Sequence, residues 1–279
     1  SYFMTPGQEL APVMLHGLQL DDDGNEPVVW LITEDISERK KVDHLKNEFI
    51  STVSHELRTP LTSISGSLGL LANNAVGELP EKASKLAHIA YRNSQQLTFL
   101  INDLLDMEKL VAGKMPFRSE HHVLQDLVHE SVENIATFAQ QRDIHLQVAE
   151  LPAVTVHVDR QRLNQAITNL LSNAIKFSPQ KAEVVVLTQL HDGLFRIEVT
   201  DYGTGIPEAF RPRIFEKFAQ ADSSDTRGRG GTGLGLAITR ETMSQMGGGV
   251  GFKSTEGYGS TFWLDIKPDE SDKPDESDE

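Results

Sequence analysis

A chain of 279 residues with a formal net charge of −15 is a poor candidate for binding nucleic acid or an anionic membrane surface, because its overall field repels both. The sequence contains no cysteine, which excludes disulfides and thiolate metal sites and is typical of a reducing compartment such as the cytoplasm. It also lacks any run of about 18 apolar residues, so we expect no membrane contact by this chain, although an upstream segment of a longer parent could anchor it.

The first 36 residues indicate the end of a larger domain. Residues 13–20 and 28–35 are predicted to be two strands joined by the turn sequence D-D-D-G-N. Because a two-stranded hairpin is marginal on its own, we expect that further strands once accompanied it. The run W-L-I-T-E-D-I-S-E-R-K-K resembles the last strand of a PAS sensor domain with its exit into a signalling helix. The resemblance implies that residues 1–36 are the C-terminal remnant of a PAS-like domain.

Residues 37–71 predict one long amphipathic helix. Its apolar residues recur in steps of three and four, close to the period of an α-helix. They are Val42, Leu45, Phe49, Val53, Leu57, Leu61, Ile64, Leu68 and Leu71. His55 lies two residues from both Val53 and Leu57, so it should project roughly opposite this stripe, toward water or a partner.

The neighbours of His55 suit phosphoryl chemistry. An imidazole is largely neutral at pH 7 and therefore nucleophilic, and Glu56 supplies a base beside it. Thr59 lies about one helical turn further on, where its hydroxyl could orient a water molecule or a phosphoryl oxygen. The run S-H-E-L-R-T-P-L resembles the phosphoacceptor box of the sensor histidine kinases of two-component signalling. The resemblance implies that His55 accepts the phosphoryl group, that Glu56 is its general base, and that Thr59 positions water during dephosphorylation of a response regulator.

A second helix should follow a connection rich in Asn, Gly and Pro. Its stripe alternates steps of three and four and is interrupted by the polar Asn93. The apolar members are Leu86, Ile89, Leu97, Leu100, Leu104, Met107 and Val111. We expect an antiparallel helical hairpin, residues 37–116 with the signalling helix, whose exposed seam pairs with a second copy to form a dimeric four-helix bundle. The alternative is that the seam packs on the C-terminal domain of the same chain.

From Phe117 the pattern changes to alternating helices and strands, which predicts an α/β sandwich over residues 117–267. The expected helices are residues 122–141, 159–177 and 233–246, with Asp159 as the N-cap of the second. The expected strands are residues 145–148, 154–158, 183–190, 194–200, 249–253 and 260–266. The fold class is therefore α+β: a helical hairpin followed by an α/β sandwich.

The last residues, 268–279, belong to a repeated acidic, proline-bearing segment without an apolar residue. Such a segment cannot bury a core, so it should be disordered. It is either a solvated tail or a linker toward a further domain.

Three polar residues share one face of the predicted helix at 159–177. Asn169, Asn173 and Lys176 are spaced by four and three residues. Asparagine is unfavourable in the middle of a helix, so two asparagines beside a lysine suggest a polar site. Their carbonyl oxygens suit Mg²⁺, which usually binds jointly with substrate phosphates, and the lysine adds a positive charge for a phosphate.

Two glycine runs lie at the ends of predicted elements. In D-Y-G-T-G-I-P, which follows a predicted strand, Asp201 either caps the turn or accepts a hydrogen bond from an exocyclic amine such as that of adenine. Its glycines allow close backbone approach. The run R-G-R-G-G-T-G-L-G-L at residues 227–236 leads into a helix, whose N-terminus and free amides favour a phosphate. Either glycine run alone is also typical of a flexible loop.

In this order, N-L-L-S-N-A-I-K-F, D-Y-G-T-G-I-P, R-I-F-E-K-F and G-G-T-G-L-G-L resemble the N box, first glycine box, F box and second glycine box of the histidine-kinase type of ATP-binding domain. The resemblance implies that Asn173 ligates Mg²⁺ and that Asn169 and Lys176 contact the phosphate region. It also implies that Asp201 reads the adenine amine and that Arg213 approaches the γ-phosphate. The glycines that would shape the pocket are Gly203, Gly205, Gly231, Gly233 and Gly235, with residues 220–232 as a mobile lid.

Together, these resemblances imply a protein-histidine kinase that uses ATP and Mg²⁺ and passes its phosphoryl group to an aspartate of a response-regulator receiver domain. The ATP-binding domain would swing onto the helices about residues 111–116, where glycine and proline lie. One alternative is an ATP-driven clamp like the chaperone, mismatch-repair and topoisomerase ATPases, which lack the His55 box and normally carry a carboxylate where this chain has Asn169. Another is a dimeric scaffold or a phosphatase-biased member that binds nucleotide without phosphorylating itself.

Overall fold

The computed structural model describes residues 2–4, 10–20, 28–149, 154–220 and 232–268, and some of these, His55 included, by their backbone alone. The chain divides into two compact units, Ser1–Ser94 and Gln95–Glu279. The boundary therefore lies inside the second long helix rather than after it. No helix in the described ranges combines the length and the apolar character needed to cross a membrane.

The first unit begins with a small antiparallel sheet in the order β1-β2-β3. Its strands are β1 (Tyr2–Met4), β2 (Leu10–Leu20) and β3 (Val28–Asp35), so the two predicted strands are confirmed and β1 is added. Leu31 and Ile32 point to opposite faces of β3, and their side chains are 67% and 55% exposed. Both faces of this part of the sheet are therefore open to solvent.

The first unit continues into the long helix α1 (Ser37–Ala72) and the first part of α2 (Glu81–Val111), which confirms the predicted helical hairpin. Where α1 and the first half of α2 meet, the Ser65 hydroxyl donates a hydrogen bond of 2.9 Å to the Ser94 hydroxyl. Gly69 faces the Tyr91 ring so closely that a Cβ there would lie 3.1 Å from a ring carbon. The short side chains of Ser65 and Ser94, and the absence of a side chain at Gly69, therefore allow the two helices to approach closely.

Part of the predicted apolar seam is left uncovered by the hairpin itself. In α1, Leu57 is 47% and Ile64 is 50% exposed. In α2, Leu86 is 67% and Ile89 is 48% exposed. Large apolar side chains that recur at helical spacing and stay exposed are expected where a second chain packs.

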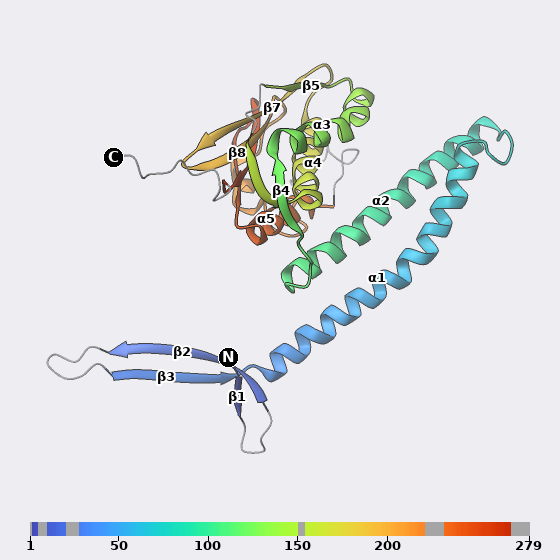
Figure 1. Cartoon of the computed structure of the whole chain (residues 1–279). Coiled ribbons are helices and arrows are strands. Elements are labelled where there is room, and N and C mark those ends of the chain that lie inside the picture. Colours follow the sequence, from blue (N-terminus) through green and yellow to red (C-terminus); the bar gives the residue numbers. More distant parts are fainter. Residues whose placement is uncertain (1, 5–9, 21–27, 150–153, 221–231, 269–279) are drawn as a thin grey trace, which may run out of the picture. The chain divides into compact units, whose positions relative to one another are not determined.

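The second unit is built on a five-stranded sheet in the order β5-β7-β8-β10-β9. Its strands are β5 (His145–Val148), β7 (Glu183–His191), β8 (Leu194–Asp201), β9 (Gly249–Thr255) and β10 (Gly259–Ile266). The β5–β7 pair is parallel and the other pairs are antiparallel. The helices α3 (Leu124–Gln141), α4 (Arg160–Phe177) and α5 (Gly235–Gln245) pack against this sheet (Figure 1). The predicted α/β sandwich is confirmed.

The prediction of a helix from residue 122 was wrong at its start. Residues Ser119–Val123 form the strand β4, which pairs antiparallel with β6 (Thr155–Asp159). The backbone N–H of Leu124 then donates to the Val154 carbonyl, and α3 begins at that residue. Hydrogen bonds to a strand distant in sequence therefore fix the conformation of His121 and His122, and no local pattern in the sequence reveals them.

The core of the second unit lies between α4 and the sheet. The fully buried side chains of α4 recur at helical spacing and include Leu163, Ile167, Leu170, Leu171 and Ile175. They meet Val184 and Val186 of β7 and Ile197 and Val199 of β8 in one apolar cluster. This packing fixes the rotation of α4 about its own axis and thereby decides which side chains its opposite face presents.

Asp159 sets the start of α4, as predicted. Its carboxylate accepts hydrogen bonds from the backbone N–H of Arg162 at 3.0 Å and of Arg118 at 2.7 Å. The first of these is the bond of an N-cap. The second ties the segment between α2 and β4 to the same residue.

Replacing Asp159 with alanine should lower the free energy of unfolding by about 1–2 kcal/mol, because α4 loses its cap and a second backbone N–H loses its acceptor. Urea unfolding followed by circular dichroism measures the change. Glu133→Ala, at an exposed position in the middle of α3, is the control and should cost about 0.5 kcal/mol or less. Equal losses in the two variants would contradict the capping role.

Candidate functional site

The polar face of α4 carries the three residues that the sequence singled out. Asn169, Asn173 and Lys176 are all partly buried and follow one another along the side of the helix that is turned away from the core. Burial lowers the pKa of the Lys176 ammonium, and the nearby Arg142 lowers it further. A negatively charged ligand beside Lys176 would offset both effects, because it favours the charged form.

Asn169 joins α4 to the second glycine box. Its side-chain nitrogen donates to the Gly235 carbonyl at 3.3 Å and to the Thr239 hydroxyl oxygen at 3.4 Å. Gly235 is the first residue of α5. The N-terminal end of α5 therefore lies against the polar face of α4, as the proposed pocket requires.

Asp201 is the last residue of β8 and is only 5% exposed. Burial raises the pKa of its carboxyl, although hydrogen bonds from the backbone N–H groups of Gly203 and Ser260 act in the opposite direction. The Gly203 bond is 2.9 Å long. A Cβ at Gly203 would collide with the carbonyl oxygen of Phe177, the last residue of α4. Only glycine lets the first glycine box approach the end of α4 this closely.

Gly233 joins the second glycine box to the F box. The backbone N–H of Phe218 donates to the Gly233 carbonyl at 3.0 Å. Gly233 has a φ of +70°, a conformation that side chains disfavour, and a Cβ there would also press on the Phe218 backbone. In the first glycine box, Gly205 has a φ of +65° and lies against the Thr255 carbonyl.

The structure describes only some of the loop residues that are expected at the nucleotide site. Arg213 ends the 3₁₀ helix η1 (Glu208–Arg213), is exposed, and donates a hydrogen bond to Glu216 at 3.0 Å. Of the expected lid over residues 220–232, residues 221–231 lie outside the described residues, and Gly231 is one of them.

The phosphoacceptor box lies in the other unit, in the middle of α1. His55 is helical, as predicted, but its side chain is outside the described part, so the expected outward projection stays a prediction. Glu56 and Thr59 are both exposed.

The last turns of α2 pack on the second glycine box, which is the alternative that the sequence had left open for the apolar seam. Met107 and Leu110 form one buried cluster with Leu234, Ala237 and Ile238. Leu104 packs against the same cluster. Leu104 and Met107 belong to the predicted apolar seam, so the seam is divided: these two residues are covered by the same chain, whereas Leu86, Ile89 and the last member, Val111, are exposed.

Polar contacts surround this apolar contact. The Thr232 hydroxyl donates to the Asp103 carboxylate at 3.0 Å and accepts from the backbone N–H of Leu234 at 3.1 Å. Burial raises the pKa of Asp103, and the charge of Asp106 adds a smaller upward effect. The Asp103 carboxylate on α2 is thus connected, through the Thr232 hydroxyl, to the backbone of the second glycine box.

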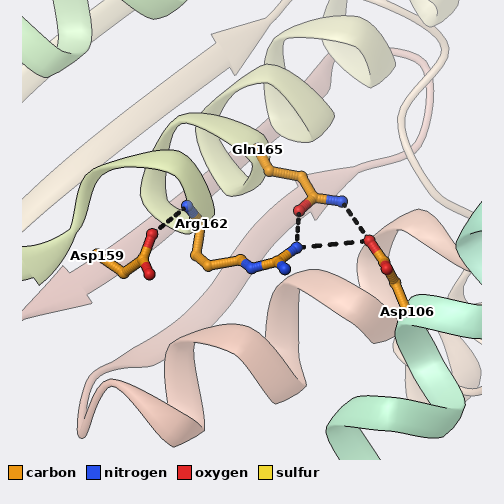
Figure 2. A network of polar contacts seen from close by, with 4 residues as sticks. All are labelled: Asp106, Asp159, Arg162 and Gln165. Carbon is orange, nitrogen blue, oxygen red and sulfur yellow. Dashed lines mark hydrogen bonds and ion pairs between the residues drawn. The ribbon is translucent and has the colours of Figure 1, made fainter. Parts of the chain in front are cut away.

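A second polar contact links α2 to the start of α4. Figure 2 shows the Asp106 carboxylate facing the Arg162 guanidinium and the Gln165 amide, both at 3.5 Å. Arg162 also donates to the Gln165 side-chain oxygen at 3.1 Å. The backbone N–H of Arg162 is the group that Asp159 caps, so the cap and the α2 contact meet at one residue. The spacing of residues along the sequence does not predict such a network, because its members come from two separate helices.

Comparison with known proteins gives two matching family models. Residues 45–113 match the His Kinase A (phospho-acceptor) domain. Residues 158–270 match the histidine kinase-, DNA gyrase B-, and HSP90-like ATPase family. The first match contains His55, and the second contains all four nucleotide motifs.

Curated relatives cover the same region. The chain is 37% identical over 224 residues to the circadian input-output histidine kinase CikA of Synechococcus elongatus, which is 78% of this chain and 30% of CikA. It is 38% identical over 232 residues to the signal transduction histidine-protein kinase BarA of Escherichia coli, which is 81% of this chain and 25% of BarA. The chain thus spans between a quarter and a third of the length of these relatives.

Among solved structures, the chain resembles full-length ShkA, which was crystallised in complex with AMPPNP. The TM-score is 0.66 with 32% sequence identity, over 78% of this chain and 45% of ShkA.

The contact between Asp103 and Thr232 should appear as a coupling energy. In a double-mutant cycle of Asp103→Ala and Thr232→Val, measured by thermal unfolding, the losses should fail to add by about 1 kcal/mol, because each single change already removes the hydrogen bond. Thr204 is exposed, so Asp103→Ala with Thr204→Val is the control and should be additive within about 0.5 kcal/mol. Additivity in both cycles would contradict the contact.

Proposed function

Because this chain belongs to the sensor histidine kinases of two-component signalling, we propose that it transfers the γ-phosphoryl group of ATP to a ring nitrogen of His55. The observation that carries the proposal is the convergence of its nucleotide motifs on α4. Asn169 bonds to Gly235, Gly203 fits against Phe177, and Gly233 bonds to Phe218. Three separate contacts thus gather four motifs, spread over 67 residues from Asn169 to Gly235, around one polar face.

The chemistry on α1 needs a nucleophile and a base. A ring nitrogen of His55 would form the new N–P bond as the bond between the β–γ bridging oxygen and the γ-phosphorus breaks and ADP leaves. Glu56 would take the proton from the other ring nitrogen. The imidazole ring therefore does not carry a positive charge once its first nitrogen is phosphorylated. Thr59, on the same side of the helix as His55, would position water when a phosphorylated regulator is dephosphorylated.

The residues around α4 have the chemistry that ATP and Mg²⁺ require. Asn169 and Asn173 offer carbonyl oxygens, the donor type that hard divalent cations prefer, with Asn173 as the proposed ligand. Burial destabilises the charged form of Lys176, and a neighbouring phosphate would stabilise it. When bound, Mg²⁺ offsets charge on the phosphates. Asp201 would accept the hydrogen bond of the adenine amine.

The remaining nucleotide residues act from loops. Arg213, now paired with Glu216, would exchange that exposed partner for the γ-phosphate, an exchange of low cost because exposed ion pairs contribute little. Gly231 would belong to a lid that closes over the nucleotide, and the backbones of Gly203, Gly205, Gly233 and Gly235 would shape the pocket.

The ATP-binding domain has to move to deliver the phosphoryl group, since His55 belongs to the other unit. We assign the hinge to residues 111–116, directly after α2, where Gly113 has a φ of +62°. Met115 is buried in the cluster with Leu234 and Ile238. Movement about this hinge would therefore have to loosen the packing of α2 on the second glycine box.

The proposed partners are a second copy of the chain and a response-regulator receiver domain. The exposed Leu57, Ile64, Leu86 and Ile89 support a four-helix bundle formed by two hairpins. The receiver would take the phosphoryl group from His55 onto an aspartate. Residues 1–36 would be the end of a PAS-like domain, and the open faces of their sheet support a missing layer.

Adenine recognition by Asp201 predicts a pH dependence. Ionised Asp201 is the better acceptor, so affinity for a fluorescent ATP analogue should fall as the pH is lowered from about 8 to about 5. Because burial raises the pKa of Asp201, the fall should start at a higher pH than for an ordinary aspartate. Asp201→Asn should bind about tenfold more weakly at neutral pH and lose this part of the profile. Identical profiles in both chains would contradict the assignment.

The direct test of the reaction is incubation with Mg²⁺ and γ-labelled ATP, with His55→Gln alongside. We expect label on the chain that is acid-labile and alkali-stable, as an N–P bond is, and none on His55→Gln. Turnover of ATP without label on either chain would instead indicate a clamp ATPase. Nucleotide binding without turnover or label would indicate a scaffold or a phosphatase-biased form.

A further inference from the structure

Thr239 is a buried hydroxyl at the contact between α4 and α5. It is 0% exposed and lies in the second turn of α5, next to the buried Ile238. A hydroxyl without a partner is costly in such a place. Its oxygen is paired here with the side-chain nitrogen of Asn169, 3.4 Å away.

The Asn169 amide has only one orientation that satisfies this contact. An amide nitrogen can only donate and an amide oxygen can only accept. Both acceptors on α5, the Gly235 carbonyl and the Thr239 hydroxyl oxygen, face the nitrogen. Rotating the amide by half a turn would bring its oxygen against the Gly235 carbonyl oxygen, which repels it. The two N–H groups are therefore used within the protein, and the carbonyl oxygen, which has no hydrogen bond to the described residues, is left for a ligand.

We propose that Thr239 is a positioning residue that fixes the Asn169 amide with its carbonyl oxygen available to the nucleotide site. Asn169 then acts as an acceptor, toward Mg²⁺ or a water molecule bound to it, rather than as a donor to a phosphate oxygen. Asn173, one turn further along the same face, supplies a second oxygen of the same kind. This inference rests on the proposed function of the site.

The chemistry of residue 239 decides the effect of a substitution. Valine has nearly the shape of threonine but lacks the acceptor, so Thr239→Val leaves one N–H of Asn169 unpaired in a buried place. The amide is then held in its orientation by the Gly235 carbonyl alone, and more weakly. Serine retains the hydroxyl and loses only a methyl group. A purely packing role would therefore tolerate valine better than serine, whereas a positioning role requires the opposite order.

The test is calorimetric titration of the full chain with AMPPNP, once in Mg²⁺ and once in EDTA. Thr239→Val should weaken binding in Mg²⁺ by about fivefold, the equivalent of one hydrogen bond, and leave binding in EDTA unchanged. Thr239→Ser should bind as the unsubstituted chain does. In an Asn169→Ala background, Thr239→Val should have no further effect, because the group that it positions is gone.

The outcomes distinguish the positioning role of Thr239 from the proposed function of the site. If the unsubstituted chain binds AMPPNP more tightly in Mg²⁺ and Thr239→Val does not weaken that binding, the positioning role is wrong and the site stands. The role is also wrong if Thr239→Val weakens binding equally in Mg²⁺ and in EDTA, or if Thr239→Ser loses as much as Thr239→Val. If the unsubstituted chain does not bind AMPPNP at all, the proposed function is wrong and the inference is lost with it.

Discussion

The packing of α4 against the sheet is the constraint on which the nucleotide site depends. Its buried leucines and isoleucines fix the rotation of the helix, and this rotation leaves Asn169, Asn173 and Lys176 on the outer side. The other motifs reach that face by contact with α4 itself, through Gly203 at its end and Gly235 beside Asn169. Loss of core packing in α4 would therefore disperse the site without changing any of its polar residues.

Much of this could be predicted from the sequence, because the signals were local. Apolar spacing predicted α1 and α2, Asp159 predicted the start of α4, and the residue pattern predicted the strands β7 and β8. The residues of the polar face followed from helical spacing alone. The strand β4 could not be predicted in this way, because His121 and His122 owe their conformation to β6, more than 30 residues away.

The packing of α2 on the second glycine box was only one of two alternatives for the apolar seam, because apolar spacing does not identify the partner that covers it. Leu104 and Met107 fit the pattern of a dimer interface, yet they are covered by Leu234 and Ile238 of the same chain. Asp103 and Asp106 appear as ordinary helix-surface charges until Thr232 and Arg162 are seen beside them. The consequence is a physical link between α2 and the nucleotide motifs.

Hydrogen exchange with and without Mg²⁺ and AMPPNP tests most directly whether the nucleotide site is assembled around α4. Slower exchange is expected in the peptides that contain residues 169–177, 201–205 and 232–238, since the ligand would tie these three segments together. Peptides from α3, which also packs on the sheet, should be unaffected. Protection confined to other segments, or binding without protection along α4, would contradict the account.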